Sequence, residues 1–169
     1  MKHVEDFKVI IKNAIDEKLK EMGLVVKYSI KVTGYKNIVM NIKSSKIDFK
    51  ENSIERYKDR IDRLVNINPN LHYDEIEELK YRISILENID PNTDYNRNIP
   101  CHLNLSYYGI ESLKCTFKDD ALEVLEMIYN VVDGVIKDWH EPDERINYLD
   151  IPFRFKFSIG ENKGGYIVK

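Results

Sequence analysis

The residues that could bind a metal ion are few and lie far apart in the chain. The sequence has four histidines and two cysteines. His3, His72 and His140 lie in separate segments, and no H-x-H or H-x-x-x-H pair could bring two imidazoles to one metal. Cys101 and His102 are adjacent, so on a strand their side chains point to opposite faces. The sequence therefore predicts no metal site and no cofactor.

Cys101 and Cys115 are the two candidates for a nucleophile or a disulfide. A nucleophilic cysteine needs a neighbouring base and a lowered pKa, whereas both thiols occupy positions predicted to face inward on strands. In an oxidising compartment the two could pair. Because the sequence shows no secretion signal, we expect two reduced core residues instead.

One cluster, residues 140–144 (HEPDE), places carboxylates beside an imidazole and could support proton transfer. A solvated loop at the end of a helix has the same composition, and we favour that interpretation. Gly164 and Gly165 follow a predicted strand but open no helix, so they do not form a phosphate-binding loop. We therefore predict that the chain is not an enzyme.

Residues 24–48 predict a β-hairpin with one apolar and one basic side. Apolar residues such as Ile30 and Met40 alternate with polar ones such as Lys31 and Lys43, as expected where side chains alternate between the faces of a strand. Gly34 lies between the two strands and can adopt a positive φ in the turn. We expect one buried sheet face and one solvated, basic face.

The polar face of this sheet is the best candidate for a binding surface. The strand predicted at 151–159 alternates phenylalanines with basic residues, and the strand predicted at 101–108 adds His102 and Asn104. The predicted partner-binding residues are one aromatic and five basic residues: Lys27, Lys31, Lys43, Tyr108, Arg154 and Lys156. Such a face can bind an acidic protein surface, can bind single-stranded nucleic acid by charge and stacking, or can be merely solvated. Nucleic acid is the weaker functional option because few aromatics are available.

Apolar residues recur at helical spacing in four segments, near 4–22, 54–65, 76–86 and 122–139. Gly23 is placed to end the first helix, Ser53 to cap the second, and Asp119 or Asp120 to cap the last. The two middle helices form a charged antiparallel hairpin over 53–89 with a narrow apolar seam. This hairpin is either a structural flap or an arm that docks on a partner.

These elements predict a single α+β domain over residues 1–169. The sheet is antiparallel with four to five strands and helices on one face, in the order α-β-β-α-α-β-β-α-β, with strands at 101–108 and 113–117 after the inserted hairpin. The composition, 43% hydrophobic and 33% charged with a net charge of −3, is ordinary for a globular chain and lacks the basicity of a dedicated nucleic-acid binder. No apolar run reaches about 18 residues, and the N-terminus is unlike a signal peptide, so we expect a cytoplasmic location.

The two ends of the chain resemble a domain associated with large polyvalent proteins of phages and conjugative elements. The resemblance lies in IIKNAIDEKLKEMGLVVKYSIKVTGYKNIVMNIK (10–43), an opening helix and hairpin, and in DERINYLDIPFRFKFSIGENKGG (143–165), a closing strand with alternating aromatics before a glycine. It implies a mobile-element setting in a bacterial host, where small stand-alone domains often counter host defence. The leading hypothesis is a non-enzymatic anti-CRISPR protein that binds a type II CRISPR nuclease. The alternative is a nucleic-acid-binding accessory module that uses the basic sheet face.

Overall fold

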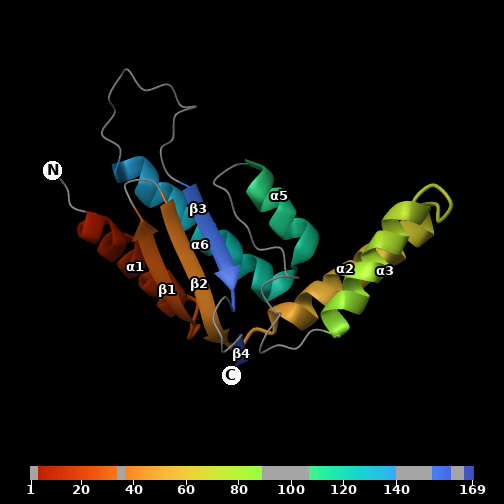
Figure 1. The fold of residues 1–169 in the computed structure, drawn as a ribbon, viewed down its shortest axis with the longest axis horizontal. Helices are drawn as coiled ribbons and strands as arrows, with labels where there is room; N and C mark the ends of the chain where they lie inside the picture. The colour runs from red at the N-terminus through yellow and green to blue at the C-terminus, as the bar shows by residue number, and fades with distance from the viewer. Residues whose placement is uncertain (1–3, 34–36, 89–106, 140–153, 161–165) are drawn as a thin grey trace, which may run out of the picture.

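The computed structural model describes residues 4–33, 37–88, 107–139, 154–160 and 166–169. These residues form α1 (Val4–Glu21), β1 (Lys27–Thr33), β2 (Asn37–Ser45), α2 (Phe49–Ile67), α3 (Tyr73–Glu87), α5 (Tyr107–Thr116), α6 (Asp119–Trp139), β3 (Arg154–Ile159) and β4 (Ile167–Val168) (Figure 1). The predicted α+β class is confirmed, with helices packed against a four-stranded sheet.

Strand β2 is the centre of the described sheet and pairs with β1, β3 and β4. β1 runs antiparallel to β2, with Ile30 opposite Met40, as the predicted hairpin requires. β3 and β4 run parallel to β2, so the prediction of an entirely antiparallel sheet is wrong on that side. The chain returns to β2 only after the helical segments α2 to α6, and a long helical crossover is what a parallel connection needs.

The apolar face of the sheet lies under α1 and α6, which also contact each other. Figure 1 shows α6 passing behind β2 and β3. Ile38, Met40 and Ile42 of β2 are fully buried there, as is Phe155 of β3. The helices contribute aliphatic and aromatic side chains spaced three or four residues apart: Phe7, Ile11 and Ile15 of α1, and Leu125, Ile128 and Val132 of α6. This face is the main core of the protein.

The end of α1 follows the prediction made from Gly23. This glycine has a φ of +65°, its N–H donates to the Lys20 carbonyl (3.0 Å), and the Leu24 N–H donates to the Leu19 carbonyl (2.9 Å). These two bonds are the Schellman arrangement, in which a left-handed glycine lets the chain leave the helix. Leu24 can then lead directly into the β-hairpin.

Residues 107–116 form helix α5, so the strand predicted at 113–117 is wrong. Leu113 and Phe117 are buried at 2% and 0% exposure, whereas Cys115 between them is exposed. Apolar residues at 113, 115 and 117 fit an alternating strand, but Leu113 with Thr116 and Phe117 also fits the i, i+3, i+4 spacing of a helix. The buried residues are those that follow the helical spacing: Leu113, Thr116 and Phe117. Residues 101–106, the rest of the predicted strand pair, lie outside the described residues.

Helices α2 and α3 form the predicted hairpin, which we call the arm, and Figure 1 shows it leaving the body of the protein. α2 begins five residues earlier than predicted because Asp48 is the N-cap: its side chain accepts a hydrogen bond from the Glu51 N–H (3.0 Å). Ser53, the predicted cap, is fully buried inside the helix instead. The seam between the helices is apolar, as predicted, with Ile54 and Tyr57 of α2 and Ile76, Leu79, Ile83 and Leu86 of α3 all buried.

The C-terminal strand fastens the sheet to the base of the arm. The buried Tyr166 hydroxyl donates to the Ile47 carbonyl (2.8 Å) and shares a hydrogen bond with Ser45 Oγ (2.5 Å). Its ring packs edge-on against Phe49, the first residue of α2, with centroids 5.5 Å apart, and Phe49 packs in the same way on Phe117 (5.8 Å). Burial raises the pKa of Tyr166 to about 12, although the hydrogen bond with Ser45 lowers it. The neutral hydroxyl is therefore part of the folded structure.

We expect the free energy of unfolding to fall between pH 10 and pH 12, and to fall less in Tyr166→Phe. A tyrosine in the unfolded chain ionises near pH 10, whereas Tyr166 in the folded protein holds its proton to about pH 12. The folded state therefore binds more protons in this window, and stability decreases as pH rises through it. Below pH 10 this contribution is complete.

Urea unfolding at pH 9 and at pH 11.5 measures the effect. Tyr166→Phe should lose about 0.5–1.5 kcal/mol at pH 9 through its missing hydrogen bonds, yet show a smaller decrease at pH 11.5. Tyr81→Phe, at a ring that is 66% exposed on α3, is the control and should show the wild-type decrease. An equal decrease in all three proteins would contradict the role given to Tyr166.

Candidate functional site

Four of the six predicted binding residues are exposed lysines of the sheet: Lys27, Lys31, Lys43 and Lys156. Lys31 and Lys156 lie on either side of Val39 in one row of the register, which places them on the same face about 10 Å apart. Lys43 is the extra residue at a β-bulge, because Lys27 pairs with Ser44 and Tyr28 pairs with Ile42. We call these four side chains the lysine face.

The other two predicted residues have different positions. Arg154 is the first residue of β3 and pairs with Asn37. Tyr108 lies in the first turn of α5, so its predicted place on a strand of the sheet is wrong, because the chain is helical there. His102 and Asn104, which were predicted to share the face, lie outside the described residues.

The polar side of the sheet is only partly solvated. Asn41 and Ser158 were predicted to face solvent, but they are 5% and 1% exposed. Ser158 Oγ donates to Asn41 Oδ1 (3.2 Å), a bond that links β3 to β2. Buried polar groups are tolerated where they are hydrogen-bonded in this way. The basic side chains that remain exposed therefore surround a buried polar contact and do not form a continuous open face.

The arm is held to the body by hydrogen bonds between α2 and the α5–α6 corner. Asn52 Nδ2 donates to the Lys118 carbonyl (3.1 Å), and the Lys118 N–H donates back to Asn52 Oδ1 (3.0 Å). Arg56 Nε donates to the Lys114 carbonyl (2.8 Å). Lys118 Nζ reaches Asp59 of α2 (3.0 Å), and this hydrogen bond raises the pKa of the ammonium group. The arm is thus fixed at its base.

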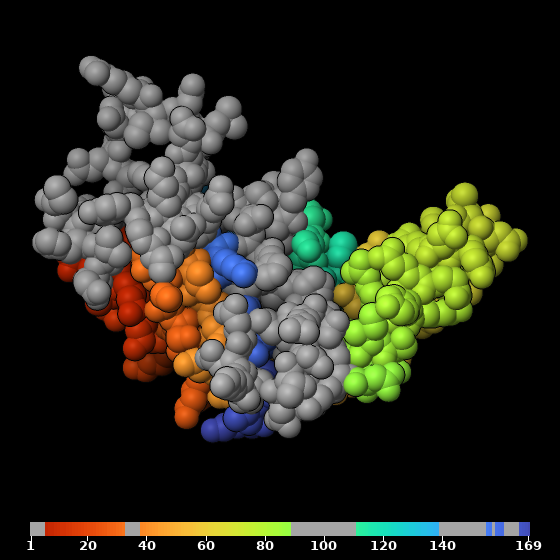
Figure 2. Space-filling model, viewed as in Figure 1, coloured from red at the N-terminus to blue at the C-terminus, as the bar shows by residue number. Residues whose placement is uncertain are grey.

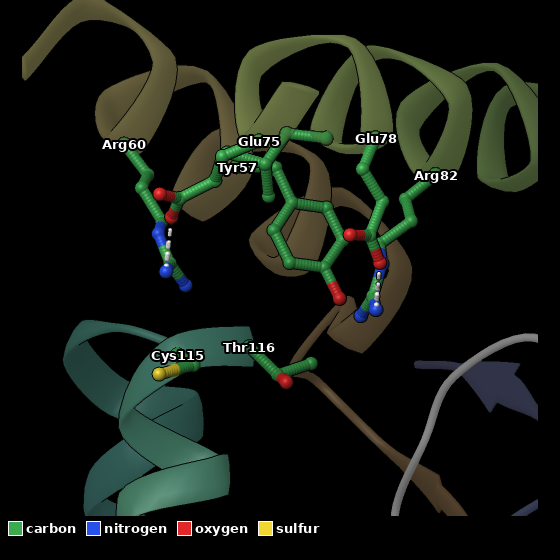
Figure 3. Close-up of a pocket in the computed structure, with 8 residues that line it drawn as sticks. Tyr57, Arg60, Glu75, Glu78, Arg82, Cys115 and Thr116 are labelled. Atoms are coloured by element: carbon green, nitrogen blue, oxygen red, sulfur yellow. Dashed lines mark hydrogen bonds and ion pairs between the residues drawn. The ribbon is translucent and has the colours of Figure 1, made fainter. Parts of the chain in front are cut away.

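A pocket of about 120 Å³ lies between the arm and the end of α5 (Figure 3). Each arginine in it is already paired with a carboxylate: Arg60 with Glu75 across the arm, and Arg82 with Glu78 within α3 (2.5 Å). The hydrogen bond that Arg82 donates to Glu78 raises the pKa of its guanidinium group. Because both cations have carboxylate partners, the pocket offers little attraction to an anionic ligand. These pairs instead stiffen the arm.

Cys115 opens onto this pocket from α5, together with Thr116. Its side chain is exposed, so the predicted core role is wrong, because α5 turns it away from the buried Leu113. The described residues that line the pocket include no histidine to act as a base. The two carboxylates that line the pocket, Glu75 and Glu78, are paired with Arg60 and Arg82.

The far end of the arm carries a group of exposed apolar residues that the sequence did not single out as a surface, and Val65, which was predicted to lie in the apolar stripe of the second helix, is among them. Val65, Ile67, Leu71 and Tyr73 are 45%, 66%, 74% and 63% exposed. We call these four residues the apolar tip. The available signal was the run Asn66–Leu71, in which Ile67 and Leu71 interrupt a stretch of asparagine and proline. Only the exposure of the turn shows that they are not part of the core.

Searches for metal sites, membrane-spanning helices and similar proteins gave no assignment for the described residues. Within the described part of the chain, no cluster of three or more histidine, cysteine or acidic residues could hold a metal ion, and none of its helices is both long and apolar enough to span a membrane. Comparison with protein-family models, with curated proteins and with solved structures gives no match to this chain.

We expect Asn52→Ala to destabilise the protein by about 1–3 kcal/mol, because it leaves the Lys118 N–H without its hydrogen-bond partner at the base of the arm. Equilibrium urea unfolding measures this change. Asn66→Ala, at an exposed position on the same helix, is the matched control and should cost less than about 0.5 kcal/mol. Equal stability of the two variants would show that the Asn52–Lys118 pair does not hold the arm.

Proposed function

We propose that this chain is a non-enzymatic protein that inhibits a type II CRISPR nuclease by binding it directly in the cytoplasm of a bacterial host. The proposal rests on one structural feature: the arm is fixed at its base, and its far end exposes apolar side chains. Exposed apolar groups of this kind characterise surfaces that bind other proteins. The resemblance of both chain ends to a domain of phages and conjugative elements supports the choice of partner.

The physical basis of such inhibition is occupancy of the nuclease and needs no chemical step. A few anchors that lose their hydration on binding supply most of the affinity in a protein interface, and tyrosine is prominent among them. Tyr73 at the apolar tip is an exposed tyrosine on a rigid support. The nuclease holds its guide–target duplex in a positively charged channel, which an arm with exposed carboxylates can approach.

We expect the protein to reduce DNA cleavage by a guide-loaded type II nuclease in proportion to its molar ratio, with inhibition complete near equimolar amounts. A binder without turnover must saturate its target, whereas an enzyme acts at far lower amounts. A cleavage assay titrated with the purified protein, together with co-purification of the two proteins, measures this ratio. Unimpaired cleavage across several nucleases at excess protein would contradict the proposal, and inhibition at a small fraction of the nuclease concentration would indicate catalysis instead.

A second candidate function, nucleic-acid binding, is favoured by one observation. Lys31 and Lys156 are exposed in a single row across the sheet, and rows of cations attract phosphates. Against this function, the one aromatic predicted on this face, Tyr108, lies on α5 and not on the sheet. Stacking of bases on aromatic side chains supplies much of the affinity for single strands. On this sheet, attraction between lysines and phosphates therefore has more support than base stacking.

If nucleic acid is the partner, a gel shift at micromolar protein should weaken steeply as salt is raised from about 50 to 200 mM, and Lys31→Glu with Lys156→Glu should abolish it. The control is Lys12→Glu with Lys20→Glu, which makes the same change of net charge at exposed positions on α1 and should keep most of the binding. A missing shift, or equal loss in both double variants, would remove the lysine face as a nucleic-acid site.

A further inference from the structure

The apolar tip stands at the end of the arm farthest from the sheet. In Figure 2 the end of the arm projects clear of the body of the protein. Leu71 and Tyr73 are 74% and 63% exposed. Leu71 lies in the turn between the two helices, where polar residues are usual, and Tyr73 is the first residue of α3. Their exposure leaves apolar surface in water, which is unfavourable unless another protein covers it.

The turn that carries the tip is ordered by its own hydrogen bonds. Asn68 Oδ1 accepts from the Asn70 and Leu71 backbone N–H groups (3.1 and 3.2 Å). The Asn68 N–H donates to the Leu64 carbonyl (3.1 Å), and the His72 N–H donates to the Asn68 carbonyl (3.3 Å). A turn fixed in this way loses little conformational entropy when it binds. The tip is therefore already shaped for a partner.

The ion pairs of the arm leave its end with a negative balance. Glu75, Glu77 and Glu78 pair with Arg60, Lys80 and Arg82. Asp62 and Asp74 form no ion pair with any residue that the structure describes, and both are exposed. The last turn of α2 carries no basic residue, but the partial negative charge of its carbonyl end is offset by the N-terminus of α3 at the same turn. The negative balance therefore comes from the two aspartates, which Arg63 opposes in part.

The size and charge of the tip favour a larger protein over a second copy as its occupant. Two tips packed on each other would bury only about a few hundred Å² on each side, whereas a stable interface buries roughly 800 Å² per partner. Two such tips would also bring their carboxylates together. A projecting end of this size fits a concave site on a larger protein.

We propose that the apolar tip docks into an apolar pocket of a partner protein whose rim carries lysine or arginine side chains. The proposal rests on the function proposed above and names the surface that performs it: Leu71 and Tyr73 enter the pocket, and Asp62 and Asp74 face its basic rim. The lysine face then makes no required contact.

The test measures binding of guide-loaded type II nuclease to immobilised wild type and to three double variants. Leu71→Ser with Tyr73→Ser removes the tip. Val9→Ser with Val25→Ser is the matched control, because these valines are 53% and 82% exposed on the body of the protein. Asp62→Asn with Asp74→Asn removes the two carboxylates. Thermal unfolding of each variant checks that it folds, as expected for exposed positions.

The tip variant should bind at least about tenfold more weakly, chiefly through faster dissociation, while the valine control stays within about twofold of wild type. The asparagine variant should associate more slowly and depend less on salt. Wild-type affinity in the tip variant, or equal loss in the valine control, would overturn the tip as the docking site and leave the inhibitor function intact. If the wild type itself does not bind the nuclease, the inhibitor function and the nuclease as the partner of the tip are both overturned.

Sedimentation of the free protein tests whether the tip binds a second copy. We expect the sedimentation coefficient to be the same for wild type and for Leu71→Ser with Tyr73→Ser at protein concentrations between about 1 and 100 µM. A dimer that this double variant dissociates would show that the tip binds a second copy, and would overturn docking on a different protein.

Discussion

The structure depends on the burial of one side of strand β2. Ile38, Met40 and Ile42 are fully buried, and β2 pairs with every other strand of the described sheet. Because side chains alternate along a strand, burial of these three residues places Val39 and Asn41 on the opposite face of the sheet. Lys43 is the extra residue of the β-bulge at the end of the pairing. The positions of the lysine face therefore follow from the core. A shift of β2 by one residue would place a lysine among α1 and α6.

The base of the arm is the second organising contact, and it joins segments from distant parts of the sequence. Phe49 packs on Phe117 before α6 and on Tyr166 near the C-terminus, while Asn52 is bonded to Lys118 through two hydrogen bonds. Polar bonds at the edge and aromatic rings inside together fix the direction of α2. A rigid arm matters for function because a fixed anchor loses less entropy on binding than a free one.

The pocket, the lysine face and the apolar tip differ in the groups that they present to solvent. The pocket beside Cys115 contains arginines that are already paired with carboxylates, and the described residues that line it include no histidine. The apolar tip and the lysine face are two separate groups of exposed side chains. Of these, the tip has the properties of an interface anchor: it is ordered, exposed and apolar.

The sequence by itself determined the elements whose periodicity was unambiguous: the hairpin of β1 and β2, the helix ending at Gly23, the seam of the arm and the long helix α6. Local patterns suffice there because alternation and the 3.6-residue period differ over many residues. Tertiary structure decided the rest. Residues 113–117 fit both periods, and it is the exposure of Cys115 together with the burial of Thr116 that distinguishes the helix from a strand. The parallel pairing of β3 needed the helical crossover. Local pattern also failed to predict exposure, because exposure depends on which residues the remainder of the chain covers. Two polar residues, Asn41 and Ser158, are buried, whereas the apolar tip is exposed.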